Sequence, residues 1–118
     1  MAEFLLVLYD NPAAFANVTP DQMQKVIEDY TGWAAKMGQE GRLVGGQKLT
    51  DEGGKIVRGH GEKASVVDGP YAETKEVIGG IFQIKADSYA EAVALSKTCP
   101  HLKYGPRIDV RQVDPMPS

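Results

Sequence analysis

Two capped helical segments, each flanked by apolar strands, constrain the fold of this chain more than any other feature. The first begins at residues 19–22, Thr-Pro-Asp-Gln, where Thr can cap a helix, Pro suits its first turn and Gln stands three residues after the cap. Apolar side chains then recur on one helical face: Met23, Val26, Ile27, Tyr30, Trp33, Ala34 and Met37. Residues 88–91, Ser-Tyr-Ala-Glu, repeat the capping pattern and predict a second helix that runs to Cys99-Pro100.

Strands are predicted over residues 4–9, 43–49, 55–58, 64–67, 77–85 and 108–113. The first is a continuous apolar run, which is typical of a strand buried on both faces. In the second, Gly45-Gly46 indicates a bulge or a close backbone approach. In the fifth, period-two alternation predicts one shared face for Ile78, Gly80, Phe82 and Ile84.

The order of these elements is strand-helix-strand, then a hairpin, then strand-helix-strand. It predicts an α+β chain with the ferredoxin-like βαββαβ fold and an inserted β-hairpin. At 118 residues, the chain is expected to form a single domain over residues 1–118. Both helices would cover one face of the antiparallel sheet and leave the other bare. Because monomers rarely tolerate such an apolar patch, we expect a homodimer that packs sheet to sheet.

Composition and charge exclude several classes of partner. The formal net charge is −3, and the nearest basic residues, Lys55, Arg58 and Lys63, are interspersed with glycines and an acid, so we expect no direct binding to nucleic acid. No apolar run approaches the roughly 20 residues that span a bilayer, and the N-terminus lacks the basic segment of a signal peptide. The lone Cys99 fits a reducing compartment. The sequence thus predicts a cytoplasmic location and no association with membranes.

Residues 67–76, Val-Asp-Gly-Pro-Tyr-Ala-Glu-Thr-Lys-Glu, contain more polar and turn-forming residues than a plain hairpin connection needs. We call this segment the Asp-Gly-Pro loop. By a purely structural interpretation, Asp68 accepts hydrogen bonds from the backbone amides that follow it, while Gly69 and Pro70 shape the turn. By the alternative interpretation, the loop presents Asp68 to a ligand, because loops held by a rigid sheet commonly carry sites.

Charged residues in and near this loop indicate the chemistry that such a site can perform. Glu73, Lys75 and Glu76 form a solvated charge run by one interpretation. By the other, a carboxylate beside the following apolar strand acts as a general acid or base. Arg58 can hold a substrate carboxylate or pair with Glu73. His60 lies between two glycines, where it can shuttle protons or be merely solvated.

No motif in the chain implies a cofactor or a metal. Gly79-Gly80 lacks the G-x-G-x-x-G spacing of dinucleotide-binding loops. Cys99, His101 and Asp109 do not have the spacing of a zinc site, which normally takes about four ligands. His101 is interpreted as a helix-end residue and Tyr30 as part of the core.

The Asp-Gly-Pro loop, with Gly79-Gly80 after it, resembles the DGPF-domain, or YCII-related, family, and the likeness covers nearly the whole chain. Supporting matches are Gly45-Gly46, Glu91-Ala92, Cys99-Pro100 and Val110-Arg111. Tyr71 stands where the family's name implies Phe. The resemblance implies a ferredoxin-like subunit that pairs into a dimeric α/β barrel, typically in bacteria, and it implies no particular reaction.

Two functional leads come with this resemblance. Some relatives are fused to, or encoded beside, sigma factors of the extracytoplasmic-function type. Others, in the broader YCII-like group, are suspected to be enzymes because of a His-Asp pair whose histidine lies in the first helix. The equivalent position here is Tyr30, and neither His60 nor His101 lies in that helix, so the resemblance does not carry this pair over.

We therefore expect the protein to bind a small polar organic molecule in a pocket near the Asp-Gly-Pro loop and, by one interpretation, to transform it without a cofactor. Asp68 and Glu73 are the candidate catalytic residues. The candidate ligand-binding residues are Arg58, His60, Gly69, Pro70, Tyr71 and Lys75. One alternative is a non-enzymatic accessory protein of an extracytoplasmic-function sigma factor. Another is that the loop only stabilises the fold.

Overall fold

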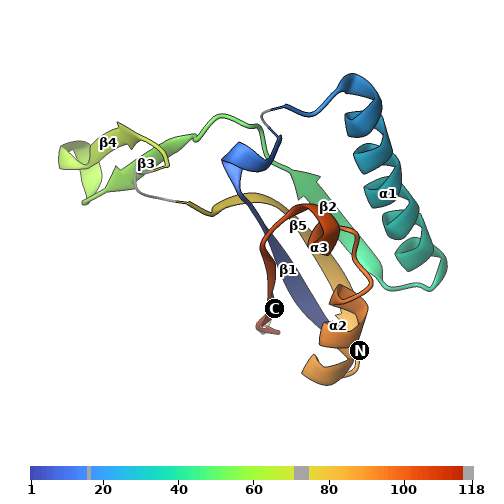
Figure 1. The fold of residues 1–118 in the computed structure, drawn as a ribbon. Coiled ribbons are helices and arrows are strands. Elements are labelled where there is room, and N and C mark those ends of the chain that lie inside the picture. Colours follow the sequence, from blue (N-terminus) through green and yellow to red (C-terminus); the bar gives the residue numbers. More distant parts are fainter. Residues whose placement is uncertain (16, 71–74, 116–118) are drawn as a thin grey trace.

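The computed structural model describes residues 1–15, 17–70 and 75–115 and has an α+β fold (Figure 1). The main sheet has the strand order β2-β5-β1-β6, and all of its pairings are antiparallel. Its strands are β1 (Ala2–Asp10), β2 (Leu43–Lys48), β5 (Val77–Ala86) and β6 (Arg107–Gln112). Each helical crossover passes over one intervening strand, as in the split βαβ unit. The predicted ferredoxin-like fold is confirmed.

α1 (Pro20–Gln39) begins where the sequence predicts, at a reciprocal cap. The Gln22 backbone amide donates to the Thr19 hydroxyl at 3.1 Å, and the Thr19 amide donates to the Gln22 side chain at 2.9 Å. These two bonds satisfy amides that the first turn of a helix leaves without partners.

α2 (Tyr89–Ser96) begins at the predicted cap, because the Ser88 hydroxyl accepts from the Glu91 amide at 3.2 Å. The helix is shorter than predicted. Pro100 has no amide hydrogen to continue a helix, and it precedes a separate short helix, α3 (His101–Tyr104). The other helical segments within the described part of the chain are two 3-10 turns, Pro12–Phe15 and Gly61–Lys63. Among the residues described, no helix is long and apolar enough to cross a membrane.

A β-bulge changes the predicted faces of β5. Leu8 pairs with Gly80 and Tyr9 pairs with Ile78, which leaves Gly79 as an extra residue between the two pairs. The alternation of side chains is reset there, so Ile78 faces away from Gly80 and is 47% exposed. The prediction that Ile78 shares a face with Gly80, Phe82 and Ile84 is therefore wrong at this one position.

A second bulge lies in β2, as the glycine pair predicts. The pairing with β5 shifts between Leu43 and Gly45, which leaves Val44 as the extra residue. The next glycine, Gly46, lies against the Phe82 ring, and a Cβ there would be 2.7 Å from a ring carbon. The prediction of a bulge is confirmed.

The core lies between one face of the main sheet and the helices. Trp33 of α1 packs on Phe82 with ring centroids 5.1 Å apart, and Tyr89 of α2 packs on Phe4 at 4.9 Å. On β1 only alternate residues are buried, and those between them are partly exposed on the opposite side, which we call the open face. The prediction that this strand is buried on both faces is wrong for a single chain. The buried core residues are Phe4, Leu6, Leu8, Trp33, Met37, Ile84, Ala86, Ala92 and Cys99.

β3 (Lys55–Arg58) and β4 (Ser65–Asp68) form the predicted inserted hairpin as a separate two-stranded sheet. Figure 1 shows that this hairpin projects from the main sheet, away from α1 and α2. Asp68 is the last residue of β4. The Gly69 amide donates to the Gly54 carbonyl at 2.9 Å, so the start of the Asp-Gly-Pro loop is tied to the segment that precedes β3.

Candidate functional site

A buried polar cluster lies at the end of β1, on the side of the helices. His101, the first residue of α3, is only 2% exposed, and both of its ring nitrogens are hydrogen-bonded. Its Nε2 lies 2.6 Å from the Tyr9 carbonyl oxygen, which can only accept, so Nε2 carries a proton and donates it. Nδ1 then accepts, at 2.6 Å, from the Tyr30 hydroxyl of α1. These two bonds fix both the plane of the ring and its tautomer.

The Tyr30 hydroxyl stays protonated in this environment. Burial first, and then the negative charge of the nearby Asp10, raise the pKa of Tyr30 well above its usual value. The hydroxyl therefore remains a hydrogen-bond donor to His101 throughout the neutral pH range.

Asp10, the last residue of β1, is the accessible part of this cluster. Its side chain is 30% exposed, and its Oδ1 lies 4.0 Å from Nε2 of His101. The bulge residue Gly79 provides the room, because a Cβ there would lie 1.8 Å from Oδ2 of Asp10. Any larger residue at this position would displace the carboxylate. The cluster thus presents one reachable carboxylate that is backed by a buried imidazole.

A second glycine, Gly105 at the end of α3, packs against the cluster. A Cβ on Gly105 would lie 2.3 Å from Nε2 of His101 and 2.5 Å from the Tyr9 carbonyl oxygen. Only a residue without a side chain can pass so close to the end of β1. The close passage helps to keep the imidazole away from solvent.

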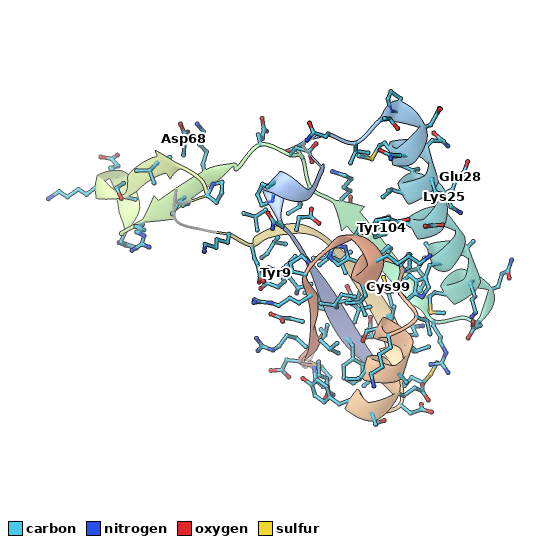
Figure 2. All side chains as sticks on the ribbon, in the orientation of Figure 1. Tyr9, Lys25, Glu28, Asp68, Cys99 and Tyr104 are labelled. Atoms are coloured by element: carbon cyan, nitrogen blue, oxygen red, sulfur yellow. The ribbon has the colours of Figure 1, made fainter. Side chains whose placement is uncertain are left out.

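A second polar group lies beside the first, between α3 and α1 (Figure 2). Tyr104 donates a hydrogen bond to Asp29, and this bond is the main reason why the pKa of Asp29 is lowered and that of Tyr104 is raised. Lys25 and Lys103 also approach the Asp29 carboxylate, at 3.4 and 3.7 Å. Two hollows, of about 390 and 700 Å³, flank this group, and Lys103 lines both of them.

The open face carries an ion-pair group at the same end of the sheet. The guanidinium carbon of Arg107 lies 4.0 Å from the centre of the Tyr9 ring. Arg107 also pairs with Glu76 at 2.7 Å and with Asp109 at 3.3 Å. Because Glu76 is the last residue of the Asp-Gly-Pro loop, the first of these pairs anchors the exit of the loop to the sheet. Arg107 is thus held by two carboxylates.

The site residues predicted from the sequence lie on or next to the hairpin. Asp68 is exposed at the end of β4, and its carboxylate pairs with Lys55 of β3. Arg58 and His60 are exposed near the turn that joins the two strands. Figure 2 shows Asp68 on the projecting hairpin, whereas Tyr9 lies in the body of the domain. The structure therefore does not bring Asp68 to the cluster around His101.

The other predicted residues belong to the Asp-Gly-Pro loop itself. Gly69 is partly buried, and Pro70 and Lys75 are exposed. A Cβ on Gly53 would lie 1.6 Å from the Gly69 carbonyl oxygen, so the start of the loop packs closely on the turn before β3. Two of the predicted site residues, Tyr71 and Glu73, lie outside the described residues.

Sequence reasoning missed the cluster at the end of β1. His101 begins α3 rather than ending a helix, and Tyr30, interpreted as core, uses its hydroxyl there. The resemblance places a histidine at the position of Tyr30. In this chain the imidazole belongs instead to His101 of α3, and it is hydrogen-bonded to the Tyr30 hydroxyl. Gly79 was the available signal, because a glycine inside a strand often marks a bulge or a close approach.

A family model described as the YCII-related domain matches residues 2–116 of the chain. A search of curated proteins found no match. Over residues 1–15, 17–70 and 75–115, no group of three or more His, Cys, Asp or Glu side chains is arranged to hold a metal ion.

Proposed function

This chain is a member of the YCII-related domain family, and we propose that it binds a small polar organic molecule at the end of its main sheet and transforms it by acid-base chemistry. The observation that carries the proposal is the approach of Asp10, 30% exposed, to the buried imidazole of His101 at 4.0 Å. A partly exposed carboxylate that lies beside an imidazole fixed by two hydrogen bonds is suited to exchange a proton with a bound molecule.

In this proposal Asp10 takes a proton from the bound molecule or returns one to it. His101 and Tyr30 are positioning residues behind it. Since the Tyr30 hydroxyl donates to Nδ1, the ring keeps its proton on Nε2, the nitrogen nearer to Asp10.

The Asp-Gly-Pro loop would lie against the same ligand. Val77, the residue that directly follows the loop, pairs with Asp10 in the sheet. Glu76 is tied to the same end of the sheet by its ion pair with β6. The assignments of Asp68 and Glu73 as catalytic residues, and of the other loop and hairpin residues as binding residues, stay predictions from the sequence. The substrate class that fits is a small molecule with an exchangeable proton and polar groups for the loop to hold.

We further propose that the protein is a homodimer packed through the open faces of its sheets. Leu5, Val7 and Ile81 are only partly buried on this face, while α1 and α2 pack on the other one. A second copy would cover these side chains and exclude water from them. Light scattering tests this directly, since the 12.8 kDa mass of one chain at micromolar concentration would contradict it.

Native mass spectrometry of the freshly purified protein tests the ligand proposal. We expect a small and reproducible added mass, whose identity then defines an assay. The identified molecule is incubated with the wild type and with Asp10→Asn, which keeps the shape of the side chain but removes the basic carboxylate. Conversion by the wild type alone supports the proposal, and equal conversion by both contradicts it. A protein that carries no small molecule and binds a sigma factor equally well with and without Asp10→Asn would favour the accessory role.

A further inference from the structure

We propose that the β3–β4 hairpin, residues Lys55–Asp68, is an arm that packs against a second copy of this chain. The inference rests on the homodimer proposed above and adds a second contact to it. The open faces provide one part of the interface. The arm of each protomer, lying on its partner, provides another.

The arm carries apolar side chains that a single chain leaves in solvent. Val57 pairs with Val66 across the two strands, so both point to the same face, and they are 63% and 60% exposed. Val67 lies on the other face and is 47% exposed. Single exposed apolar residues are ordinary, but a cross-strand pair of valines forms a continuous patch. Such a patch on a projecting element indicates a contact surface.

The arm also lacks the support that a small sheet needs. Among the described strands, β3 and β4 pair only with each other. A two-stranded hairpin is at best marginally stable in water, and its outer edges present unpaired backbone groups. A surface that covers the valines would stabilise both strands.

The shape of the chain leaves the arm free to reach a neighbour. Its radius of gyration is 16.2 Å, whereas a compact domain of this length has a value of about 13.5 Å. The molecule measures 46 × 45 × 19 Å, so it is broad and only about two layers thick. The arm therefore extends in the plane of the domain and does not fold back over either face of the main sheet (Figure 1).

The open face by itself is a small interface, which leaves room for a further contact within the dimer. From a strand spacing of about 4.8 Å and a rise of about 3.3 Å per residue, a four-stranded face six residues long covers roughly 380 Å² in projection. A stable interface buries about 800 Å² on each partner. In a two-fold dimer each protomer both provides an arm and receives one, so the arm enlarges the interface twice.

Charge is complementary as well. The arm contains three cationic residues and two anionic ones, for a net charge of +1. The whole chain carries −3, which leaves −4 on the remainder. The arm of one protomer thus meets a body of opposite net charge on the other, which favours the contact and weakens with added salt.

The test is the dissociation constant of the dimer, measured by analytical ultracentrifugation, for the wild type and for the double variant Val57→Lys and Val66→Lys. Val93→Lys is the matched control, because Val93 is an exposed valine, at 38%, on the helix side of the domain. We expect the double variant to raise the dissociation constant about tenfold or more and the control to leave it unchanged.

The possible outcomes distinguish the proposed arm contact from the proposed sheet-to-sheet dimer. A dimer whose dissociation constant is the same in the wild type and the double variant overturns the arm contact but leaves the sheet-to-sheet dimer standing. A monomeric wild type overturns both. If the double variant fails to fold, hydrogen exchange of the wild type decides the question. Backbone amides of the arm that are protected in the dimer and not after dilution to monomer support the contact, and equal exchange in the two states overturns it.

Discussion

An aspartate and a histidine occur both in the cluster at the end of β1 and on the β3–β4 hairpin, but their surroundings differ. At the end of β1, His101 is 2% exposed with both ring nitrogens bonded, and Asp10 stands beside it. On the hairpin, Asp68 is 83% exposed and pairs with Lys55, and His60 is exposed at the turn. The same residue types therefore have a fixed geometry in one region and a solvated one in the other. The hydrogen bonds and packing around a residue therefore prepare it for chemistry more than a local sequence motif does.

The largest expected effect separates the two histidines. His101→Ala removes a buried ring and leaves the Tyr30 hydroxyl and the Tyr9 carbonyl without a partner, so the free energy of unfolding should fall by about 3 kcal/mol. His60→Ala should change it by less than about 0.5 kcal/mol, because that side chain is exposed. Urea denaturation of the three proteins measures both. Equal losses of unfolding free energy in the two variants would contradict the claim that only His101 is held by its surroundings.

Tyr30→Phe isolates the bond that holds the imidazole. The ring of Tyr30 is kept, but Nδ1 of His101 loses its donor in a buried environment, which should cost about 1.5 kcal/mol of unfolding free energy. Urea denaturation measures this loss. An NMR spectrum of the imidazole nitrogens should also show a change of tautomer or of hydrogen bonding at His101. A Tyr30→Phe protein with the wild-type stability and the wild-type imidazole signals would contradict the assigned bond.

The same tyrosine predicts a pH dependence. Burial, with the charge of Asp10, raises the pKa of Tyr30 in the folded state, while the unfolded state titrates near pH 10. The unfolded chain therefore loses this proton first, so the contribution of Tyr30 is complete below about pH 10 and is lost as the pH rises further, by up to about 1.4 kcal/mol per pH unit. The stability difference between the wild type and Tyr30→Phe should narrow above this pH. A difference that is constant with pH would contradict the burial of the hydroxyl.

Gly79→Ala should separate ligand binding from stability. The added Cβ would lie 1.8 Å from Oδ2 of Asp10, so the carboxylate must turn away from the position that it holds beside His101. We expect the affinity for the identified ligand to fall about tenfold, which is about 1.4 kcal/mol. Isothermal titration calorimetry measures this. Gly45→Ala is the matched control, since no atom lies within 4 Å of its added Cβ, and it should bind as the wild type does.

The smallest effect is expected at the hairpin. Asp68→Asn breaks an ion pair whose side chains are 68% and 83% exposed, and pairs of this kind contribute less than about 0.5 kcal/mol. Thermal denaturation at low and high salt measures the change. A loss above about 1 kcal/mol would instead support the interpretation in which Asp68 caps backbone amides of the Asp-Gly-Pro loop.

Much of the fold follows from local patterns in the sequence. The caps at Thr19 and Ser88, and the glycine pair in β2, act within a few residues, so the helix starts and one bulge could be predicted. The bulge at Gly79 depends on how β5 pairs with β1, and a glycine inside the strand is its only local signal. For this reason the face of Ile78 was predicted wrongly.

The cluster at the end of β1 could not be predicted for a related reason. His101 bonds to Tyr30, 71 positions away, and to Tyr9, 92 positions away, and neither spacing forms a motif. The residues of the Asp-Gly-Pro loop are consecutive in the sequence, so they could be recognised as a motif and predicted as a site. Its site assignments to Asp68 and Glu73 stay predictions.

Native mass spectrometry of the wild type, Asp10→Asn and Asp68→Asn, purified side by side, tests most directly whether the ligand binds at the end of β1. We expect the wild type to carry a small added mass, Asp10→Asn to lose it and Asp68→Asn to keep at least part of it, because of the two aspartates only Asp10 lies beside a fixed imidazole. An added mass that Asp10→Asn retains in full, or that disappears only from Asp68→Asn, would contradict the placement of the site at the end of β1.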